Sequence, residues 1–313
     1  MGDLSGVTAL PLLIAVGDPA GIGPEVSVKA LASLELGNVI LVGCKSSIQA
    51  EASRVLGRLL PVIDSIRSVP EWSVYEPPLG GDGAVEVASI RVAAEACLAG
   101  NGRALVTGPI HKGRLAAKGF KFKGHTDFLG AIAGTEPVMA FAGGHLRVAL
   151  VTAHVPLCKV PELATEERVT RVITCANQAL LSLGIERPKL ALCGVNPHAG
   201  EGGVIGDDEI SNLNPAVMAA RSMGLNVELP VAAENAFRSL NSRDCDMVVA
   251  MYHDQALPVL KLLAFGSLVN WTIGLPFVRT SVDHGTADDI VGQDIAEPSS
   301  MTAAIELALN LTA

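Results

Sequence analysis

The length of its apolar runs limits what this chain can fold into more than any other feature. The runs at 12–16, 39–42 and 248–251 contain four or five residues each, which suits a buried strand. A helix that crosses a bilayer needs about 20 apolar residues in a row. Although 49% of the 313 residues are hydrophobic, the runs predict strands of a buried sheet and argue against a membrane partner.

Segments with helical periodicity lie between these runs. The first part of the chain predicts a strand at 11–17, a helix at 23–36 and a second strand at 39–44. This alternation is typical of an α/β protein with a largely parallel sheet. Further strands are expected at 104–107, 138–142, 146–152, 189–195, 227–231, 247–251 and 268–272, and further helices at 85–99, 165–183, 213–223 and 301–311.

The charge balance excludes nucleic acid and anionic membranes as main partners. The chain has 23 Lys and Arg against 32 Asp and Glu, a net charge of -9, and no basic tract. No positive charge precedes the apolar segment at 9–16, so we expect no secretory signal and a cytoplasmic protein. Six cysteines without a CxxC pair fit reduced thiols in a core.

Six of the seven histidines lie where a predicted strand passes into a loop. They are His111, His125, His154, His198, His253 and His284, whereas His145 looks incidental. His154, His198 and His253 each closely follow a buried strand, so one edge of the sheet could present three imidazoles to a divalent metal with an open coordination position. The alternative is three histidines that cap helices or form ordinary hydrogen bonds.

A second group of residues suits a small anion. Lys261, Asn270 and Arg279, joined by His125 and Thr126, could bind phosphate through charge-assisted hydrogen bonds. The alternative is a solvated polar face, although Lys and Arg are scarce in this chain.

The glycine-rich segment GDPAGIGPE at 17–25 follows a strand and begins a helix, as a phosphate-binding loop would. It contains neither GxGxxG nor GK[ST], the two patterns of such loops. A tight turn between strand and helix, closely packed, explains it equally well.

These motifs together resemble the 4-hydroxythreonine-4-phosphate dehydrogenase family of pyridoxal phosphate biosynthesis. The resemblance runs nearly from end to end. Its motifs are GDPAGIGPE at 17–25, TGPIHKG at 107–113, GHTDFL at 124–129, TAHVP at 152–156, NPHAGEGG at 196–203, YHDQALPVLK at 252–261 and VNWTIGLPFVRTSVDHGTA at 269–287.

The resemblance implies a two-lobed fold like that of isocitrate and isopropylmalate dehydrogenases, with the active site in the cleft between the lobes. Residues 1–130 with 272–313 would form the terminal lobe, which carries the cofactor loop, and 131–271 the central lobe, which dimerises. In the implied homodimer His154 and His198 bind a metal from one subunit and His253 from the other. His125, Thr126, Lys261, Asn270 and Arg279 would bind the substrate.

The segment at 284–298 also resembles the adenosine-binding loop of isopropylmalate dehydrogenases, written HGSAPDIAG there. This places the cofactor at His284, Gly285, Thr286, Ala287 and Asp289. A carboxylate at Asp289 can accept a hydrogen bond from a ribose hydroxyl and would repel a 2′-phosphate. We therefore expect NAD in preference to NADP.

The family reaction is the oxidation of 4-phosphohydroxy-L-threonine and its decarboxylation to 3-amino-2-oxopropyl phosphate. One divalent metal per site, zinc first and cobalt, manganese or magnesium as alternatives, would lower the pKa of the substrate hydroxyl. Asp254 and Asp246 are candidates for the general base, and either could instead orient a metal-binding imidazole.

Two positions depart from the family pattern: Ala256 stands where Gly is common, and Asp127 where Glu is common. Related subgroups oxidise 4-phosphoerythronate, 4-phosphothreonate or a terephthalate dihydrodiol, so these substrates stay open. Two other classes also remain: a phosphotransacetylase, which shares a lobed fold, and a protein that binds metal and NAD without turnover.

Overall fold

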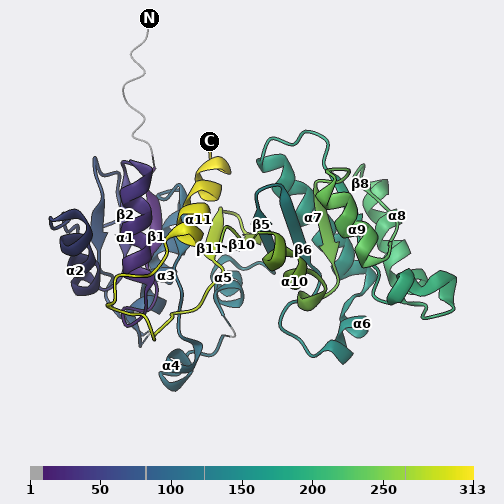
Figure 1. The fold of residues 1–313 in the computed structure, drawn as a ribbon, viewed down its shortest axis with the longest axis horizontal. Coiled ribbons are helices and arrows are strands. Elements are labelled where there is room, and N and C mark those ends of the chain that lie inside the picture. Colours follow the sequence, from purple (N-terminus) through teal and green to yellow (C-terminus); the bar gives the residue numbers. More distant parts are fainter. Residues whose placement is uncertain (1–9, 82, 123, 265) are drawn as a thin grey trace, which may run out of the picture. The chain divides into compact units, whose positions relative to one another are not determined.

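The computed structural model describes residues 10–313 except 82, 123 and 265 (Figure 1). The apolar segment weighed as a secretory signal begins just outside this range. The chain forms two compact units, Met1–Pro137 with Leu275–Ala313, and Val138–Gly274. We call them unit 1 and unit 2. Their boundaries lie a few residues after the expected ones at 130 and 271.

Unit 1 contains a parallel sheet. Its strands, in spatial order, are β3(Ser73–Tyr75), β2(Val39–Val42), β1(Leu12–Ala15), β4(Ala104–Thr107) and β11(Arg279–Val282). Almost all of their side chains are buried, as the uninterrupted apolar runs predicted for strands covered on both faces. Parallel pairing brings the carboxyl ends of these strands to one edge of the sheet.

Helices cover this sheet. They are α1(Gly23–Leu34), α2(Lys45–Leu56), α3(Val85–Leu98), α4(Lys112–Ala117), α5(His125–Ala133) and α11(Ser299–Asn310). Leu13, Ile40 and Leu105 share a buried cluster with Ile90 of α3 and Phe128 of α5. Helix α11 packs on β11 and β4, and α1 packs on α2 and α11. The C-terminal segment therefore completes a unit that the N-terminal segment begins.

Unit 2 contains a mixed sheet. Its strands, in spatial order, are β10(Val269–Ile273), β5(Val138–Gly143), β6(Leu146–Leu150), β9(Met247–Ala250), β7(Lys189–Leu192) and β8(Asn226–Val227). Strand β5 runs antiparallel to both β10 and β6, whereas the strands from β6 to β8 are parallel. A two-residue hairpin turn, Gly144 and His145, joins β5 to β6, with Gly144 at φ +59°.

Helices and short helical turns complete unit 2. They are η1(Leu157–Lys159), α6(Val160–Leu163), α7(Glu166–Ser182), η2(Pro197–Gly203), η3(Glu209–Leu213), α8(Asn214–Ser222), α9(Ala233–Asn241) and α10(His253–Leu263). Phe237 of α9 and Leu260 of α10 share a buried cluster with Leu150 and Val248 of the sheet. Helix α7 packs on β6, β7 and β9, and the Thr165 hydroxyl caps its N-terminus by accepting the N–H of Arg168.

The α/β class predicted from the sequence is confirmed, although individual elements differ from those expected. The strand expected at 227–231 ends at Val227 and returns only as a bridge between Cys193 and Val231. Pro230 has no N–H to donate to a ladder, which explains the interruption. The antiparallel β5 was not expected, because a short apolar run carries no sign of its direction.

Candidate functional site

Two of the three predicted metal ligands lie side by side in unit 2. His154 follows β6 and His253 follows β9, and their ring centroids are 5.7 Å apart. The two strand exits stay paired beyond the sheet, since Val151 N–H donates to Ala250 (2.8 Å) and the Thr152 hydroxyl to Met251 (2.7 Å). The register of two parallel strands thus delivers both imidazoles to one edge.

Asp254 holds the His253 ring in one orientation. The Nδ1 atom of His253 lies 2.7 Å from Oδ1 of Asp254, and the ring is nearly perpendicular to that of Phe141, with centroids 6.4 Å apart. If Nδ1 donates to the carboxylate, Nε2 keeps its lone pair and is suited to bind a metal. This geometry matches an orienting carboxylate, one of the two roles expected of Asp254.

The third predicted ligand, His198, lies in a constrained turn. His198 has φ +53°, and the turn is closed by the buried Glu209, which accepts the Asn196 N–H at 2.8 Å and the Asn196 amide at 3.0 Å. A Cβ on Gly200 (φ +77°) would lie 2.6 Å from Oε2 of Glu209. Packing therefore fixes the conformation of the NPHAGEGG motif.

The described part of the chain contains no group of three His, Cys, Asp or Glu side chains that could hold a metal ion. His154 and His253 approach each other within one chain, and His198 is not brought together with them into such a group. The placement of His253 in a second subunit remains a prediction.

Gln255 connects three elements of this edge, and the sequence analysis did not single it out. Its Oε1 accepts the N–H of Met251 at 2.7 Å, and its Nε2 donates to the carbonyl of Gly194 at 2.8 Å. One amide thus joins the end of β9, the start of α10 and the segment after β7. Its position in YHDQ, directly after His253 and Asp254, was the available signal.

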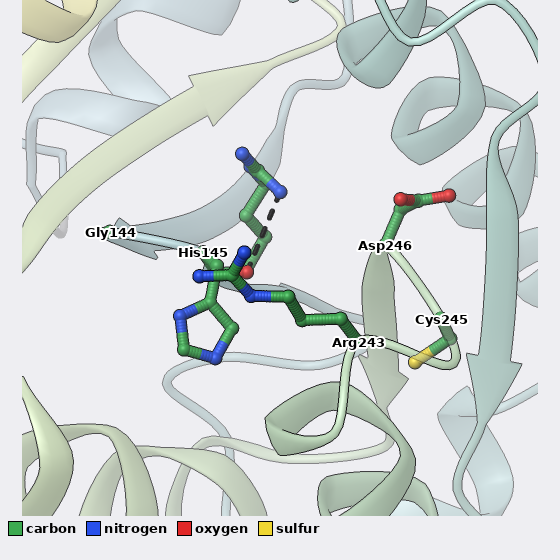
Figure 2. Close-up of a pocket in the computed structure, with 6 residues that line it drawn as sticks. Gly144, His145, Arg243, Cys245 and Asp246 are labelled. Carbon is green, nitrogen blue, oxygen red and sulfur yellow. Dashed lines mark hydrogen bonds between the residues drawn. The ribbon is translucent and has the colours of Figure 1, made fainter.

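Asp246, the other candidate base, lies at the wrong end of β9. It precedes the strand, and its Oδ2 accepts the N–H of Lys189 at 2.8 Å. His253 follows the strand, so the length of β9, about 13 Å, separates the two residues. The structure does not bring Asp246 together with the histidines: it lies at the amino edge of the sheet, in the pocket of Figure 2.

Unit 1 gathers donors for an anion. Arg279 is 1% exposed, and its Nη2 donates to the Thr107 hydroxyl (2.6 Å) at the carboxyl end of β4. Burial lowers the pKa of Arg279 to about 9. A negative charge stabilises a buried guanidinium, so Arg279 is a candidate for binding an anion.

His125 begins α5 close to this arginine. Its Nε2 is buried and has no hydrogen-bond partner among the described residues. Burial, then the positive charges of Arg279 and Lys112, hold the pKa of His125 well below its usual value. A neutral imidazole and two cations therefore converge, and Lys112 is a member that the sequence analysis missed, although it lies in TGPIHKG.

The remaining predicted substrate residues are divided between the units. Thr126 lies half-buried in the first turn of α5 in unit 1. Lys261 lies on α10 and Asn270 on β10, both in unit 2.

Arg114 ties the predicted cofactor loop to the rest of unit 1. It donates to Asp18 at 2.8 Å and to both oxygens of Asp288 at 2.6 and 3.1 Å. The hydrogen bonds from Arg114 lower the pKa of Asp288 to about 2. Asp289, the expected partner of the ribose, is exposed and outside this ion pair. Neither Arg114 nor Asp18 was predicted.

The glycine-rich GDPAGIGPE segment is a closely packed turn, one of the two possibilities for it. The N–H of Ile22 donates to the carbonyl of Thr286 at 3.0 Å, and a Cβ on Gly21 would lie 2.8 Å from Cβ of Thr286. The far end of the cofactor loop is also held, since Lys29 binds Glu25 (2.7 Å) and Asp294 (2.9 Å). The loop is therefore anchored at both ends.

Comparison with known proteins identifies the family. The family model described as "Pyridoxal phosphate biosynthetic protein PdxA" matches residues 30–308. The chain belongs to the PdxA family. It is 38% identical to the 4-hydroxythreonine-4-phosphate dehydrogenase of Colwellia psychrerythraea, over 96% of this chain and 98% of that protein.

Solved structures of related dehydrogenases are also similar to this chain. The 4-hydroxythreonine-4-phosphate dehydrogenase of Klebsiella pneumoniae has a TM-score of 0.84 and 34% identity, over 97% of this chain and 100% of that one. A terephthalate 1,2-cis-dihydrodiol dehydrogenase of Burkholderia xenovorans has a TM-score of 0.71 and 30% identity, over 96% and 98%. As a member of this family, the chain is an oxidoreductase of the dehydrogenase class that acts on a CH–OH group.

More distant likenesses concern the fold alone. The isocitrate dehydrogenase of Methylococcus capsulatus has a TM-score of 0.50 at 14% identity, over 96% of this chain and 85% of that one. The expected similarity to the isocitrate dehydrogenase fold is confirmed. None of the described helices is long and apolar enough to cross a membrane.

Proposed function

We propose that this PdxA-family protein oxidises 4-phosphohydroxy-L-threonine with NAD and decarboxylates the product to 3-amino-2-oxopropyl phosphate. The observation that carries the proposal is the pair His154 and His253, 5.7 Å apart and beside the Asp254 carboxylate. The name shared by its relatives supports the substrate class. We also propose a cytoplasmic location, as expected for an acidic chain with scattered cysteines.

The edge of unit 2 supplies two imidazoles of the kind that bind a divalent metal. His154 and His253 would hold the ion, with His198 as the third ligand in a homodimer that shares its sites. The ion would supply a Lewis acid that lowers the pKa of the substrate hydroxyl and stabilises the enolate. Nitrogen ligands favour zinc, with cobalt, manganese or magnesium as alternatives.

The basic residues of unit 1 would bind the anionic end of the substrate. The buried Arg279 gives a fixed guanidinium, and the neutral His125 gives an imidazole whose unpartnered Nε2 can donate without adding charge. Thr126, Lys261 and Asn270 complete the proposed set.

Asp254 is the proposed proton acceptor or orienting group. The Asp254 carboxylate contacts the His253 ring and can fix its orientation. Because it is also exposed, it can accept a proton from the substrate or from water. Asp246 has no part in this proposal.

The anchored loop would receive the cofactor, which accepts the hydride. Residues 284–289 follow β11, and the Arg114 ion pairs hold Asp288, which leaves the Asp289 carboxylate exposed at the turn. The Asp289 carboxylate would accept a hydrogen bond from a ribose hydroxyl and would repel a 2′-phosphate. We therefore propose NAD in preference to NADP.

The test is metal-dependent NADH formation, followed by absorbance, with 4-phosphohydroxy-L-threonine, 4-phosphothreonate, 4-phosphoerythronate and the terephthalate dihydrodiol. The proposal expects fastest turnover of the amino acid and loss of activity in His253→Ala. Arg238→Gln, on the exposed face of α9, is the matched surface control. A preference for a sugar acid or the dihydrodiol would overturn the substrate, and metal-independent turnover would overturn the site.

A further inference from the structure

The turns that precede β6 and β9 form a pocket in unit 2 that the proposed function does not use (Figure 2). Its volume is about 410 Å³, and its lining is Gly144, His145, Arg147, Arg243, Cys245 and Asp246. Pockets of ~300–1,000 Å³ are typical of small-molecule sites. It lies at the amino edge of the two strands whose carboxyl ends lead to His154 and His253.

Two guanidinium groups line this pocket, Arg147 and the exposed Arg243. Arg147 is half-buried, and its one hydrogen bond is a long one, 3.5 Å from Nη1 to the carbonyl of His145. Arg243 extends toward the His145 side of the pocket in Figure 2. Among the described residues neither arginine forms an ion pair with Asp246 or any other carboxylate. Two cations that share one pocket attract an anion.

His145 adds a third donor. Its Nε2 is buried and has no hydrogen-bond partner within the part of the chain that the structure covers. A buried polar atom without a hydrogen-bond partner is unfavourable, so a ligand that supplies the partner would be stabilised. Burial also lowers the pKa of Arg147, even though Asp246 acts in the opposite direction. A bound anion would stabilise this cation.

Asp246 gives the pocket a second chemical character. Its Oδ2 accepts the N–H of Lys189, and its Oδ1 has no hydrogen bond among the described residues. A carboxylate oxygen with a free lone pair repels an anion but can accept a hydrogen bond from a hydroxyl group. The ligand should therefore carry its negative charge at one end and a hydroxyl at the other.

We propose that this pocket is a binding site for a small hydroxylated phosphate monoester. Arg147, Arg243 and His145 would bind the phosphate, and Asp246 would accept a hydrogen bond from the hydroxyl. Two guanidinium groups and an imidazole offer more donors than the two oxygens of a carboxylate can accept, which favours the three terminal oxygens of a phosphate. The site is separate from the anion-binding residues of unit 1.

The test measures amide hydrogen exchange of the full-length protein with glycerol 3-phosphate, inorganic phosphate or malonate, at constant ionic strength set with potassium chloride. Glycerol 3-phosphate is expected to slow exchange at 143–147 and 243–246 more than phosphate does, and malonate and chloride are expected to have little effect. Peptides that contain Lys112 and His125 report separately on the unit 1 residues, so binding there is not confused with binding here.

Variants decide whether the pocket is responsible. Arg147→Gln/Arg243→Gln should raise the Kd for glycerol 3-phosphate at least tenfold, whereas the charge-matched Arg58→Gln/Arg238→Gln should not change it. Asp246→Asn keeps an acceptor for the N–H of Lys189. It should weaken the binding of glycerol 3-phosphate more than the binding of inorganic phosphate. If the double variant does not fold, the single variants Arg147→Lys and Arg243→Lys replace it. Equal affinity in wild type and pocket variants, or equal protection by chloride, would overturn the proposal.

Discussion

Arg114 binds Asp288 through two hydrogen bonds, of 2.6 and 3.1 Å, although 174 residues separate them in the chain. The same guanidinium binds Asp18, so it joins the turn after β1, the start of α4 and the loop after β11. A loop that would otherwise be free to move is thereby held against the unit that carries the proposed anion site.

Removing this connection should weaken cofactor binding without unfolding the protein. Arg114→Gln is expected to raise the KM for NAD about tenfold or more, because the loop would no longer be held in one geometry. Steady-state kinetics check this, with the exposed Arg58→Gln as the matched control. An unchanged KM for NAD would show that the loop does not bind the cofactor or does not depend on Arg114.

Acid should release the same loop. The folded pKa of Asp288 is about 2, below its ordinary value of 3.8, so the ion pair stabilises the fold fully above about pH 4 and this contribution is lost as the pH falls toward 2. In wild type, the protection of the amides at 284–298 from hydrogen exchange should therefore fall as the pH is lowered through this window. In Asp288→Asn these amides should already be poorly protected at neutral pH. Strong protection in that variant would contradict the role of the ion pair.

Substrate affinity should fall in alkali because of Arg279. Burial lowers its pKa from 12.5 to about 9, so the free protein loses this cation above about pH 9. We expect kcat/KM to decline with this pKa, since that parameter reports groups of the free enzyme. Arg279→Gln should be slow at all pH values and lack the alkaline step. A step that persists in the variant belongs to another group.

The same shift affects stability in the opposite direction. Because the folded pKa lies below the unfolded one, the folded state binds fewer protons between about pH 9 and 12.5, and the contribution of Arg279 to stability rises with pH there. Loss of substrate affinity in this range is therefore not a sign of unfolding by this residue.

Gln255 should act through the histidines. Gln255→Leu removes two hydrogen bonds at the end of β9 and is expected to lower the free energy of unfolding by about 1–3 kcal/mol and the metal affinity about 10–100-fold. Gln49 offers a matched control, since its amide makes the same pair of bonds to Leu60 in unit 1. Gln49→Leu should lose similar stability in denaturant titrations while isothermal titration with zinc finds unchanged affinity.

The turn that carries His198 can be tested at Gly200. Gly200→Ala should lower the free energy of unfolding by about 1–3 kcal/mol, since its Cβ would meet Glu209 at a positive φ, and should weaken metal binding. Gly184 has a similar φ of +79° with open space around it, so Gly184→Ala gives the backbone strain without the clash. Equal metal affinity in both variants would separate His198 from the metal.

The two aspartates proposed as bases should differ sharply. Asp254→Asn is expected to lower kcat about 10–100-fold, because it touches His253. Asp246→Asn should keep kcat within about threefold, because it lies at the other end of β9 and Asn still accepts the N–H of Lys189. Rate measurements at saturating substrate decide this, and a large loss in Asp246→Asn would restore it to the mechanism.

The sequence allowed the placement of His154 and His253 to be predicted because both follow apolar runs of adjacent parallel strands, and parallel strands end at one edge. Asp246 precedes its strand, so the same rule places it at the opposite edge of the sheet. Arg114 could not be found, because its partners Asp18 and Asp288 are 96 and 174 residues away and no local pattern connects them.

The direction of β5 was hidden for a related reason. Its apolar residues suit either direction, and only the two-residue turn at Gly144 and His145 forces the chain to reverse. The short turn was visible in AGGHLRV as two glycines, and His145 was set aside as incidental there. Both residues of this turn line the pocket for which we propose a new ligand.

The way unit 1 is divided along the chain has a consequence for biosynthesis. Arg279 reaches Thr107 across 172 residues, and β11 and α11 come from the last 39 residues of the chain. All of unit 2 is therefore synthesised before the final strand and helix of unit 1. The edge of β4 therefore stays unpaired until residues 275–313 have been synthesised.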